Sequence, residues 1–233
     1  MENKSSSERA RDVQTMFTRI AGRYDLMNRL MTAGQDMRWR REVIRRAGLP
    51  AQGRLLDLGA GTGDLARLGL EKSHGCQVTA ADFTFEMMRE GRKVASPAGL
   101  AWSAADALNL PFARESFDAV VSGFLLRNVT DVKRSLREQR RVLKPGGRLV
   151  TLDTTRPRPS LLTPFIQFHL HVVIPTLGRL LASQPEAYRY LPESTEHFLS
   201  AEQLAAAMQE TGFRKVGFHL LMAGTIAIHW GEK

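Results

Sequence analysis

The sequence has a single cysteine, Cys76, among its 233 residues. One cysteine can form neither an internal disulfide nor a cysteine metal cluster, so a reducing, cytoplasmic setting is the default expectation. No spacing of histidines and carboxylates is typical of a metal site, and we predict none. Aromatic residues make up only 7% of the chain, and basic residues do not alternate with them as they do in surfaces that stack bases. We therefore expect no nucleic-acid partner.

Long apolar runs are also scarce. The most apolar long stretch, residues 161–181, contains two prolines, two histidines, a glutamine and an arginine, and is too polar for a membrane span. Residues 1–11 are polar and charged, without the apolar core of a signal peptide. With 43% hydrophobic and 24% charged residues, no repeat and no Pro/Gly-rich linker, the chain is expected to form one globular domain.

Positive charge is abundant. The formal net charge is +9, and residues 8–46 contain ten arginines but only five acidic residues. Such a surface attracts phosphate, whether of nucleic acid or of anionic lipid. A solvated helix face with partial ion pairing explains the same pattern, so charge alone does not decide.

Hydrophobic periodicity predicts the secondary structure. Apolar residues recur at helical spacing over residues 8–49, broken near Gly22 and Gly34, which predicts two or three short helices that cap a domain. Residues 53–153 alternate between strands and helices, which is typical of a parallel sheet with right-handed crossovers. The predicted strands are 54–58, 77–82, 100–104, 117–122 and 148–153, and the predicted helices are 64–71, 84–94 and 132–143, the last stopped by Pro145-Gly146-Gly147.

The remainder of the chain is expected to add a helical insert and a closing hairpin. Helices are predicted over 161–181 and 187–191, and a further helix follows Ser200, its N-cap, with Gln203 three residues on. Strands near 213–220 and 222–230 would pair as an antiparallel hairpin. The predicted α/β fold is Rossmann-like, with a seven-stranded, mostly parallel sheet. Its four parts are a helical cap (1–49), a core (53–153), a helical insert (156–199) and a closing helix and hairpin (200–233).

The strongest local pattern is a buried strand that runs into a glycine-rich turn and opens a helix. Glycines at 59, 61 and 63 allow positive φ and a close approach of the backbone to a ligand. A dinucleotide fingerprint would place a glycine at 64, where the sequence has Asp64. Asp57 and Asp64 on either side of the turn favour a cationic, zwitterionic ligand over a pyrophosphate.

Two more acidic residues follow the next two strands. Asp82 ends the second strand, where a carboxylate can accept both hydroxyls of a ribose. Asp106 follows the third strand beside the backbone amide of Ala107, where the pair could read an adenine edge; a turn or cap role for Asp106 stays open. Since ligands of open α/β sheets bind at this edge, the three sites together predict a nucleoside ligand.

These motifs belong to a longer set of blocks. With them the sequence resembles the class I methyltransferases and, more narrowly, the ubiquinone/menaquinone biosynthesis C-methyltransferase family. The glycine turn is shared by many methyltransferases, whereas the blocks at 23–28, 126–131 and 190–194 are more particular to this family. The matching blocks are 13–28, Leu56-Asp57-Leu58-Gly59-Ala60-Gly61-Thr62-Gly63-Asp64, Leu126-Arg127-Asn128-Val129-Thr130-Asp131, 141–147, Tyr190-Leu191-Pro192-Glu193-Ser194 and 224–229.

The resemblance implies a reaction and a cofactor. Such enzymes move the methyl group of S-adenosylmethionine (SAM) to a ring carbon of a prenylated quinol, of the demethylmenaquinol or demethylubiquinol type. The family contacts map onto Thr62, Asp82 and the Asp106-Ala107 pair, while a family serine aligns with Gly123 and leaves Ser122 as its candidate substitute. The complete predicted cofactor-binding set is Asp57, Gly59, Gly61, Thr62, Gly63, Asp82, Phe83, Asp106, Ala107 and Ser122.

Two departures from the family pattern concern the substrate. Leu125 stands where the family usually has glycine, and Thr154-Thr155 replaces its usual Phe-Ser. Both lie near the expected substrate pocket, so they bear on the identity of the substrate more than on the cofactor.

The chemistry needs a cation near the quinol. A ring carbon becomes nucleophilic when its neighbouring hydroxyl, with a pKa of about 10 in a free phenol, loses a proton. Arg127 is the first candidate for that cation, with Asn128 orienting the oxygen and Tyr24 contacting cofactor or quinol. The alternatives are an ion pair of Arg127 with Asp131 or another surface acid, and a packed core role for Tyr24. His169 and His171 are weaker candidates for a base, because a lone histidine in a helix more often packs or faces solvent, and His229 is expected to be structural.

Three other functions stay open. The same scaffold could methylate a different small molecule, or bind a cofactor without catalysis. A nucleic-acid methyltransferase would usually carry an Asn/Asp-Pro-Pro-aromatic segment, where residues 122–128 here differ. The quinol hypothesis also gives the insert a role in sheltering a prenyl tail and the arginine-rich face a role in transient contact with anionic headgroups at the inner face of a membrane. A homodimer stays open.

Overall fold

The structure, a computed structural model, describes residues 6–73, 75–94, 98–156 and 198–233, together with single positions between 157 and 197. Apart from those single positions, the predicted helical insert falls outside the described residues. His169, His171 and most of the 190–194 block fall outside them as well.

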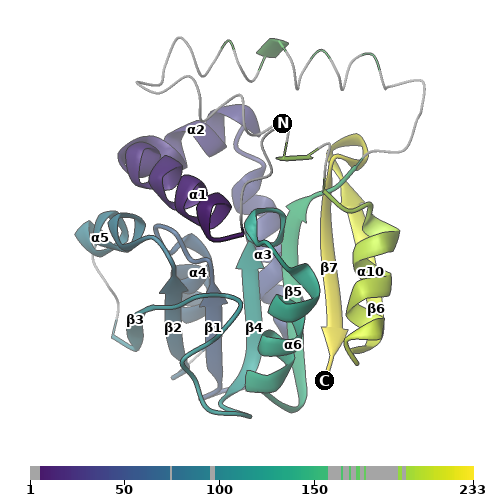
Figure 1. Cartoon of the computed structure of the whole chain (residues 1–233). Coiled ribbons are helices and arrows are strands. Elements are labelled where there is room, and N and C mark those ends of the chain that lie inside the picture. Colours follow the sequence, from purple (N-terminus) through teal and green to yellow (C-terminus); the bar gives the residue numbers. More distant parts are fainter. Residues whose placement is uncertain are drawn as a thin grey trace.

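A seven-stranded sheet forms the centre of the molecule, in the order β3-β2-β1-β4-β5-β7-β6. The pairs among β1 to β5 are all parallel, whereas β7 inserts between β5 and β6 and runs antiparallel to both (Figure 1). This confirms the predicted mostly parallel sheet with a closing hairpin. The strands are β1 (Arg54–Leu58), β2 (Gln77–Asp82), β3 (Leu100–Ala104), β4 (Phe117–Gly123), β5 (Leu143–Thr154), β6 (Arg214–Leu221) and β7 (Ile226–Glu232).

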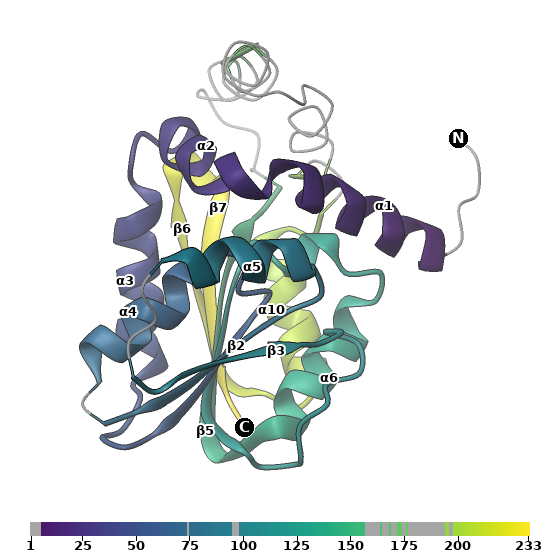
Figure 2. The same ribbon diagram turned by 90° about the vertical axis from the view of Figure 1, so that its left-hand side faces the viewer.

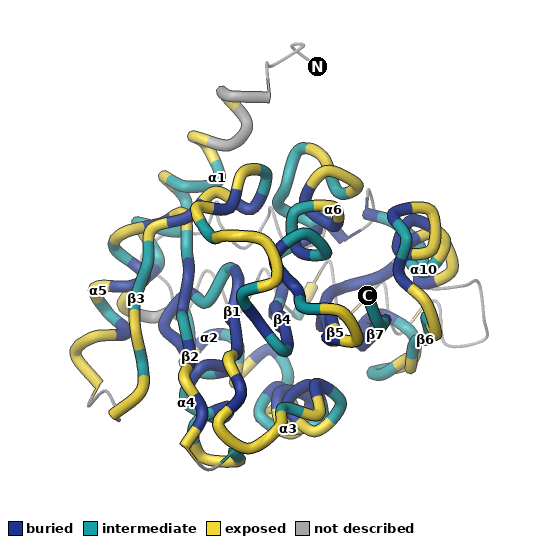
Figure 3. The backbone as a smooth tube through the Cα atoms, turned by 90° about the horizontal axis from the view of Figure 1, so that it is seen from below, coloured by how far each residue is buried: buried dark blue, intermediate teal, exposed yellow. Residues whose placement is uncertain are grey.

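Helices cover both faces of the sheet, because the central strands are apolar on both sides. On one face, α3 (Asp36–Ala47) and α4 (Asp64–Lys72) form a continuous buried cluster with the strands. On the other face, α6 (Val132–Val142) and α10 (Ala201–Glu210) form a second cluster (Figure 3). The capping box of Ser200 and Gln203 starts α10 as predicted.

The amino-terminal helices lie over the carboxyl ends of the parallel strands (Figures 1 and 2). They are α1 (Ser6–Ile20), the 3₁₀ turn η1 (Ala21–Arg23) and α2 (Tyr24–Met31). Gln14 of α1 donates a hydrogen bond to the carbonyl of Phe83 at 3.1 Å, just ahead of α5 (Phe85–Lys93). Thr18 donates to Glu86 of α5 at 3.2 Å. The predicted short capping helices are thus confirmed, and α1 is attached at the edge of the sheet where the predicted ligand site lies.

Two strand boundaries differ from the prediction. The strand expected to begin at 148 begins at Leu143, which pairs with Phe117. The next pair is Ala119 with Arg148, and the Pro-Gly-Gly segment lies in the bulge between these two pairs. The last strand begins at 226 rather than 222, because residues 222–224 form a 3₁₀ turn with positive φ throughout. The first difference is a bulge within one strand pairing, and the second is the turn of the β6–β7 hairpin. The glycines and apolar residues alone do not locate either of them.

Candidate active site

A cavity of about 520 Å³ opens at the carboxyl ends of β1, β2 and β4, beneath α1. Segments far apart in the sequence form its wall, as expected for a ligand site of an open α/β sheet. The wall consists of Arg11, Val13, Gln14, Phe17 and Tyr24 from α1 to α2, of Leu58, Gly59 and Gly61, of Asp82, Phe83, Thr84 and Met87, of residues 105–108, and of Gly123, Phe124, Leu125, Asn128, Val129 and Thr130.

The glycine turn and Asp82 form one side of the cavity. Gly59 and Gly61 have φ values of 68° and 56°, which side chains with a Cβ rarely adopt. One carboxylate oxygen of Asp82 accepts the Gly61 amide at 2.7 Å, and the other accepts the Thr84 amide at 2.7 Å. Burial raises the pKa of Asp82, and these backbone hydrogen bonds oppose that rise. Asp82 therefore fixes the turn and still presents carboxylate lone pairs at the cavity wall.

Asp57 lies behind the turn instead of on the cavity wall. It is almost completely buried; one carboxylate oxygen accepts the Ala66 amide at 2.9 Å, and the other has no hydrogen-bond partner in the described part of the chain. Burial raises the pKa of Asp57 to about 7, with the Ala66 hydrogen bond and the charge of Arg40 acting against the rise. An unsatisfied buried carboxylate oxygen next to the turn is suited to a hydrogen-bond donor or a cation.

Thr62 and Gly63 also face away from the cavity. Thr62 donates a hydrogen bond from its hydroxyl to Asp25 of α2 at 2.8 Å, so it joins the glycine turn to the cap. Burial raises the pKa of Asp25, as does the charge of Asp64, while the Thr62 hydrogen bond lowers it. Gly63 precedes α4 with a φ of 88°. Sequence reasoning missed the contact between Thr62 and Asp25, because no local pattern tells which turn residue meets the cap.

The segment after β3 brings Asp106 and Ala107 to the cavity wall, as predicted. Asp106 accepts the Leu108 amide on one carboxylate oxygen at 2.9 Å, so it also has the turn role that the sequence left open. Three side chains of α6, at helical spacing, hydrogen-bond the backbone of residues 108–112, which follow this pair in the chain. Arg134 donates to the Leu108 carbonyl at 2.9 Å, Glu138 accepts the Leu110 amide at 2.9 Å, and Arg141 donates to the carbonyls of Leu110 and Phe112 at 2.9 and 2.8 Å.

At the end of β4, Gly123 lines the cavity and Ser122 does not. Ser122 is fully buried in the sheet, where its hydroxyl donates to Thr151 of β5 at 2.9 Å. Side chains alternate across a strand, so neighbouring residues cannot replace one another at the cavity. The geometry therefore gives no support to Ser122 as a substitute for the family serine.

Phe124 begins a turn that shapes the side of the cavity opposite Asp82. It has a φ of 59°, an uncommon conformation for a residue with a Cβ. The backbone of Phe124 is held from two sides, since its amide donates to Leu152 at 2.7 Å and its carbonyl accepts from the Asn128 side chain at 2.8 Å. Leu125 packs against Gly59, where a Cβ would come within 2.8 Å of the leucine side chain.

Arg127, on the 3₁₀ turn η2 (Leu126–Asn128), is nearly buried and does not line the cavity. Its Nε lies 3.8 Å from Asp153, and its guanidinium lies 5.2 Å from the centre of the Phe124 ring. Burial raises the pKa of Asp153, and the positive charge of Arg127 opposes this. The partner of Arg127 is thus a buried acid on β5, not Asp131, whose carboxylate caps α6.

Tyr24 and Asn128 are the predicted catalytic residues that reach the cavity wall. The Tyr24 ring contacts Phe17 edge to face, with centroids 5.8 Å apart. Burial raises the pKa of Tyr24, while a hydrogen bond with Asn28 and the charges of Arg127 and Arg40 lower it. A phenol at this wall therefore feels the positive charge of Arg127, even though that side chain lies behind the surface.

Other residues fall outside the site. His229 is buried, its Nε2 lies 2.9 Å from the carbonyl of Ala201, and burial lowers its pKa, which fits the structural role expected for it. Thr154 and Thr155 do not line the cavity, whereas Leu125 does. Residues such as Arg11, Gln14 and Met87 were missed, because helical periodicity shows that a helix packs but not over which cavity. Within the described ranges, no group of histidine, cysteine and acidic side chains could hold a metal, and no helix could span a membrane.

Comparisons with known proteins agree with this arrangement. A family model described as the ubiE/COQ5 methyltransferase family matches residues 3–233. The ubiquinone/menaquinone biosynthesis C-methyltransferase UbiE of Desulfotalea psychrophila is 50% identical over 221 residues, which cover 95% of this chain and 90% of that protein. The demethylmenaquinone methyltransferase of Thermus thermophilus is 44% identical over 220 residues, which cover 94% of this chain and 100% of that protein.

Solved structures share the fold at much lower identity. The [4+2]-cyclase SpnF has a TM-score of 0.69 at 18% identity, with 95% of this chain and 94% of that chain covered. A SAM-dependent methyltransferase of Thermotoga maritima has a TM-score of 0.64 at 22% identity, with 94% and 98% covered. These likenesses show a Rossmann-like methyltransferase fold and nothing further.

Proposed function

This chain belongs to the ubiE/COQ5 methyltransferase family and is a SAM-dependent methyltransferase, and we propose that it methylates a ring carbon of a prenylated quinol. The observation that carries the proposal is a single cavity with a polar side at the glycine turn and Asp82 and an apolar side at Phe17, Phe124 and Leu125. Similar proteins are named for ubiquinone/menaquinone biosynthesis and for demethylmenaquinone methylation.

The polar side fits a sulfonium nucleoside. Asp82 has lone pairs for ribose hydroxyls, the Asp106-Ala107 pair lies where an adenine edge would be read, and the bare backbone of Gly59 and Gly61 permits close approach. The unpartnered oxygen of Asp57 lies behind the same turn. We propose that these residues hold SAM, which supplies an electrophilic methyl group, with Phe83 at the mouth and Thr62 and Gly63 supporting the turn. Ser122 is left out of this set because its hydroxyl is bonded inside the sheet.

The opposite side is suited to a quinol ring. The chain must place the ring carbon in line with the methyl group, exclude water, and favour the phenolate over the phenol. Asn128 and Tyr24 are the polar groups placed to orient the quinol oxygen. The buried charge of Arg127 favours the phenolate of a quinol at this wall, just as it opposes the burial that raises the pKa of Tyr24. Arg127 thus acts through the field in the cavity, while Asp153 accepts its backbone amide at 3.2 Å and lies 3.8 Å from its Nε.

The proposal is tested by incubating the protein with labelled SAM and a panel of demethylated naphthoquinols and benzoquinols. Transfer of the label to a ring carbon is expected for at least one quinol. Arg127→Gln should lower kcat roughly 100-fold, because a field that favours the phenolate is worth several kcal/mol, and leave the Kd for SAM within about twofold. The loss should shrink as pH rises toward the pKa of the free quinol.

Arg127→Lys is the matched control, since it keeps the positive charge beside Asp153 and should retain most of the turnover. Equal losses in SAM affinity and turnover in both variants would mean that Arg127 only supports the fold. A panel without any methylated quinol, from protein that binds SAM, would reject the quinol substrate.

A different small-molecule substrate is the second candidate. Leu125 fills the space beside Gly59 that the glycine usual in the family would leave open. A smaller or differently shaped acceptor would fit a cavity in which Leu125 takes up this space. Methylation of soluble phenols in the same panel, with no quinol product, would favour this candidate.

We propose further that the cap approaches an anionic membrane to collect its lipid substrate. On α2, Leu26 and Leu30 lie one turn apart and are 56% and 42% exposed, and the Arg29 side chain between them is 51% exposed. Exposed apolar residues beside arginine favour an interfacial position. Leu26→Ser/Leu30→Ser should reduce co-sedimentation with anionic vesicles and leave SAM binding unchanged, whereas binding independent of anionic lipid would count against the proposal. A cytoplasmic setting and the lack of a metal stay predictions of the sequence, and a homodimer stays open.

A further inference from the structure

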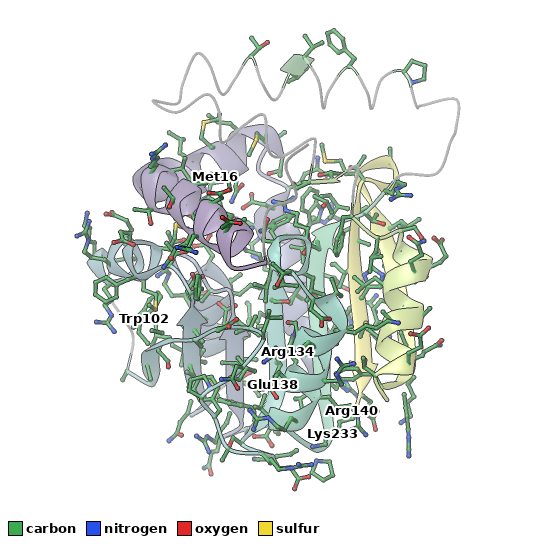
Figure 4. The ribbon with its side chains drawn as sticks, viewed as in Figure 1. Met16, Trp102, Arg134, Glu138, Arg140 and Lys233 are labelled. Atoms are coloured by element: carbon green, nitrogen blue, oxygen red, sulfur yellow. The ribbon has the colours of Figure 1, made fainter. Side chains whose placement is uncertain are left out.

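A second concave surface lies along α6 and adjoins the active-site cavity at Leu108, which lines both. It is a groove of about 520 Å³ between α6, the segment 108–115 and Lys233. Figure 4 labels Arg134, Glu138, Arg140 and Lys233 along it. We call it the α6 groove.

Positive charge in the α6 groove exceeds negative charge. Six basic side chains line it, against the two acids Glu115 and Glu138. Arg141 holds both oxygens of Glu138 at 2.8 Å, and Lys233 lies 3.3 Å from Glu115. Both acids are therefore already paired. Arg114, Arg137 and Arg140 have no carboxylate partner in the described part of the chain. Arg134 forms no close ion pair there either, although its charge contributes to the lowered pKa of Glu138.

Two of these arginines are held in fixed positions. The Nε of Arg134 donates to the Leu108 carbonyl at 2.9 Å, and the Nε of Arg140 donates to the Gly212 carbonyl at 3.1 Å. Each hydrogen bond uses one of the five N–H groups of a guanidinium and leaves the outer ones for a ligand. Arg134, Arg137 and Arg140 follow one another at intervals of three residues, over about 9 Å of the helix axis.

We propose that the α6 groove binds a small ligand that carries a chain of two or more phosphate groups. Guanidinium groups hold phosphate oxygens in pairs, so an array of four arginines, two of them held in place, matches consecutive phosphates better than it matches a single anion. The groove has the volume of a small-molecule site, which favours a compact ligand over a polymer. Arg114, Arg137 and Arg140 do not line the active-site cavity, and the proposal does not depend on the quinol substrate.

The test is calorimetric titration of the full chain with inorganic tripolyphosphate at low salt, beside orthophosphate. Arg114→Gln/Arg137→Gln is the informative variant, since neither side chain forms a hydrogen bond or ion pair within the described ranges. The variant should bind tripolyphosphate about tenfold or more weakly, the factor expected for loss of a charge-assisted hydrogen bond. Orthophosphate should bind at least about tenfold more weakly than tripolyphosphate.

Arg89→Gln/Arg92→Gln on α5 is the matched control, because it removes the same charge from two exposed arginines elsewhere. Its affinity should stay within about twofold of the parent. Equal weakening in both variants, or no binding of tripolyphosphate, would overturn the proposal. Arginine-dependent binding of a single-stranded RNA that tripolyphosphate does not displace would overturn it in favour of a nucleic-acid surface.

Discussion

At the residue scale, Asp57 shows how burial controls the charge beside the active-site cavity. Its pKa of about 7 in the folded chain exceeds the ordinary value, because the carboxylate is buried and meets only one backbone amide. The folded state therefore binds a proton that the unfolded state releases at lower pH. The stability that depends on this proton is fully present below about pH 4 and is lost as pH rises toward 7.

Asp57→Asn should remove this pH dependence. Relative to the parent, the free energy of unfolding of the variant should rise by roughly 3 kcal/mol between pH 5 and pH 8, measured by urea denaturation at each pH. Burial also raises the pKa values of Asp25, Asp82 and Asp153, which are present in both proteins. Of these three, Asp82 is coupled to the substitution, because its charge helps to raise the pKa of Asp57.

Asp118→Asn is the control for this prediction. Partial burial raises the pKa of Asp118, but the hydrogen bonds from Lys144 and Arg54 outweigh burial and lower it. Its stabilising effect is thus complete above the ordinary pKa and is lost only at acid pH, so the difference from the parent should be flat between pH 5 and pH 8. A flat difference for Asp57→Asn as well would contradict a raised pKa for Asp57.

The residue scale is also where the sequence prediction was least complete. Gly59, Asp82 and Asp106 could be placed at the cavity because each ends or directly follows a strand, and parallel strands end at one edge. The sequence could not distinguish Ser122 from Gly123, because a one-residue shift turns a side chain to the other face. Nor could it show that Arg127 meets Asp153, since Arg127 lies on η2 and Asp153 on β5, and their contact depends on the turn at Phe124.

At the element scale, α6 acts on the cavity through the segment after β3. Arg134, Glu138 and Arg141 share one face of the helix and hydrogen-bond the backbone of residues 108–112, which continue directly from the Asp106-Ala107 pair. Because these hydrogen bonds already fix the loop, the Asp106-Ala107 pair can bind a ligand without a further loss of conformational entropy.

Glu138→Ala should loosen this loop. The Leu110 amide would lose its acceptor and Arg141 its partner, so we expect the Kd for SAM to rise roughly three- to tenfold, in line with one or two lost hydrogen bonds. Hydrogen exchange at Leu110 should become faster in the same variant. The measurement is calorimetry together with amide exchange.

Glu210→Ala is the matched control, because it breaks the exposed pair of Lys133 and Glu210, which joins α6 to α10 at 2.6 Å without touching the loop. Its SAM affinity should be unchanged, since exposed pairs contribute little. Faster exchange at Leu110 in Glu138→Ala with unchanged SAM affinity would show that the loop is not coupled to the site.

Elements were predicted well where the periodicity is strong and poorly where pairing depends on turns. The five core strands, the helices between them and the capping helices follow from local patterns, and β7 was expected as half of a hairpin. The pairing of Leu143 before the Pro-Gly-Gly segment and the 3₁₀ turn after β6 depend on contacts with other strands, which local patterns do not contain.

At the scale of the whole molecule, the sheet and the cap form different parts of the active-site cavity. The sheet edge supplies the polar side of the cavity, and the cap, attached through Gln14, Thr18 and the pair of Thr62 and Asp25, covers it. The fold class could be predicted from the alternation of strands and helices, whereas the covering of the site by α1 required the structure. The net charge of +9 belongs to the whole chain, and basic side chains are concentrated in the α6 groove and in the cap.

The central claim is that Asp82 and the glycine turn hold SAM, and calorimetric titration of SAM into the parent, Asp82→Asn and Glu71→Gln tests it most directly. Glu71 is exposed on α4, so Glu71→Gln removes the same charge at a position away from the cavity. The account predicts binding by the parent and by Glu71→Gln, and a Kd roughly 10- to 100-fold higher for folded Asp82→Asn, because hydrogen bonds to a charged acceptor are lost. No binding by the folded parent, or equal affinity in the parent and Asp82→Asn, would contradict it.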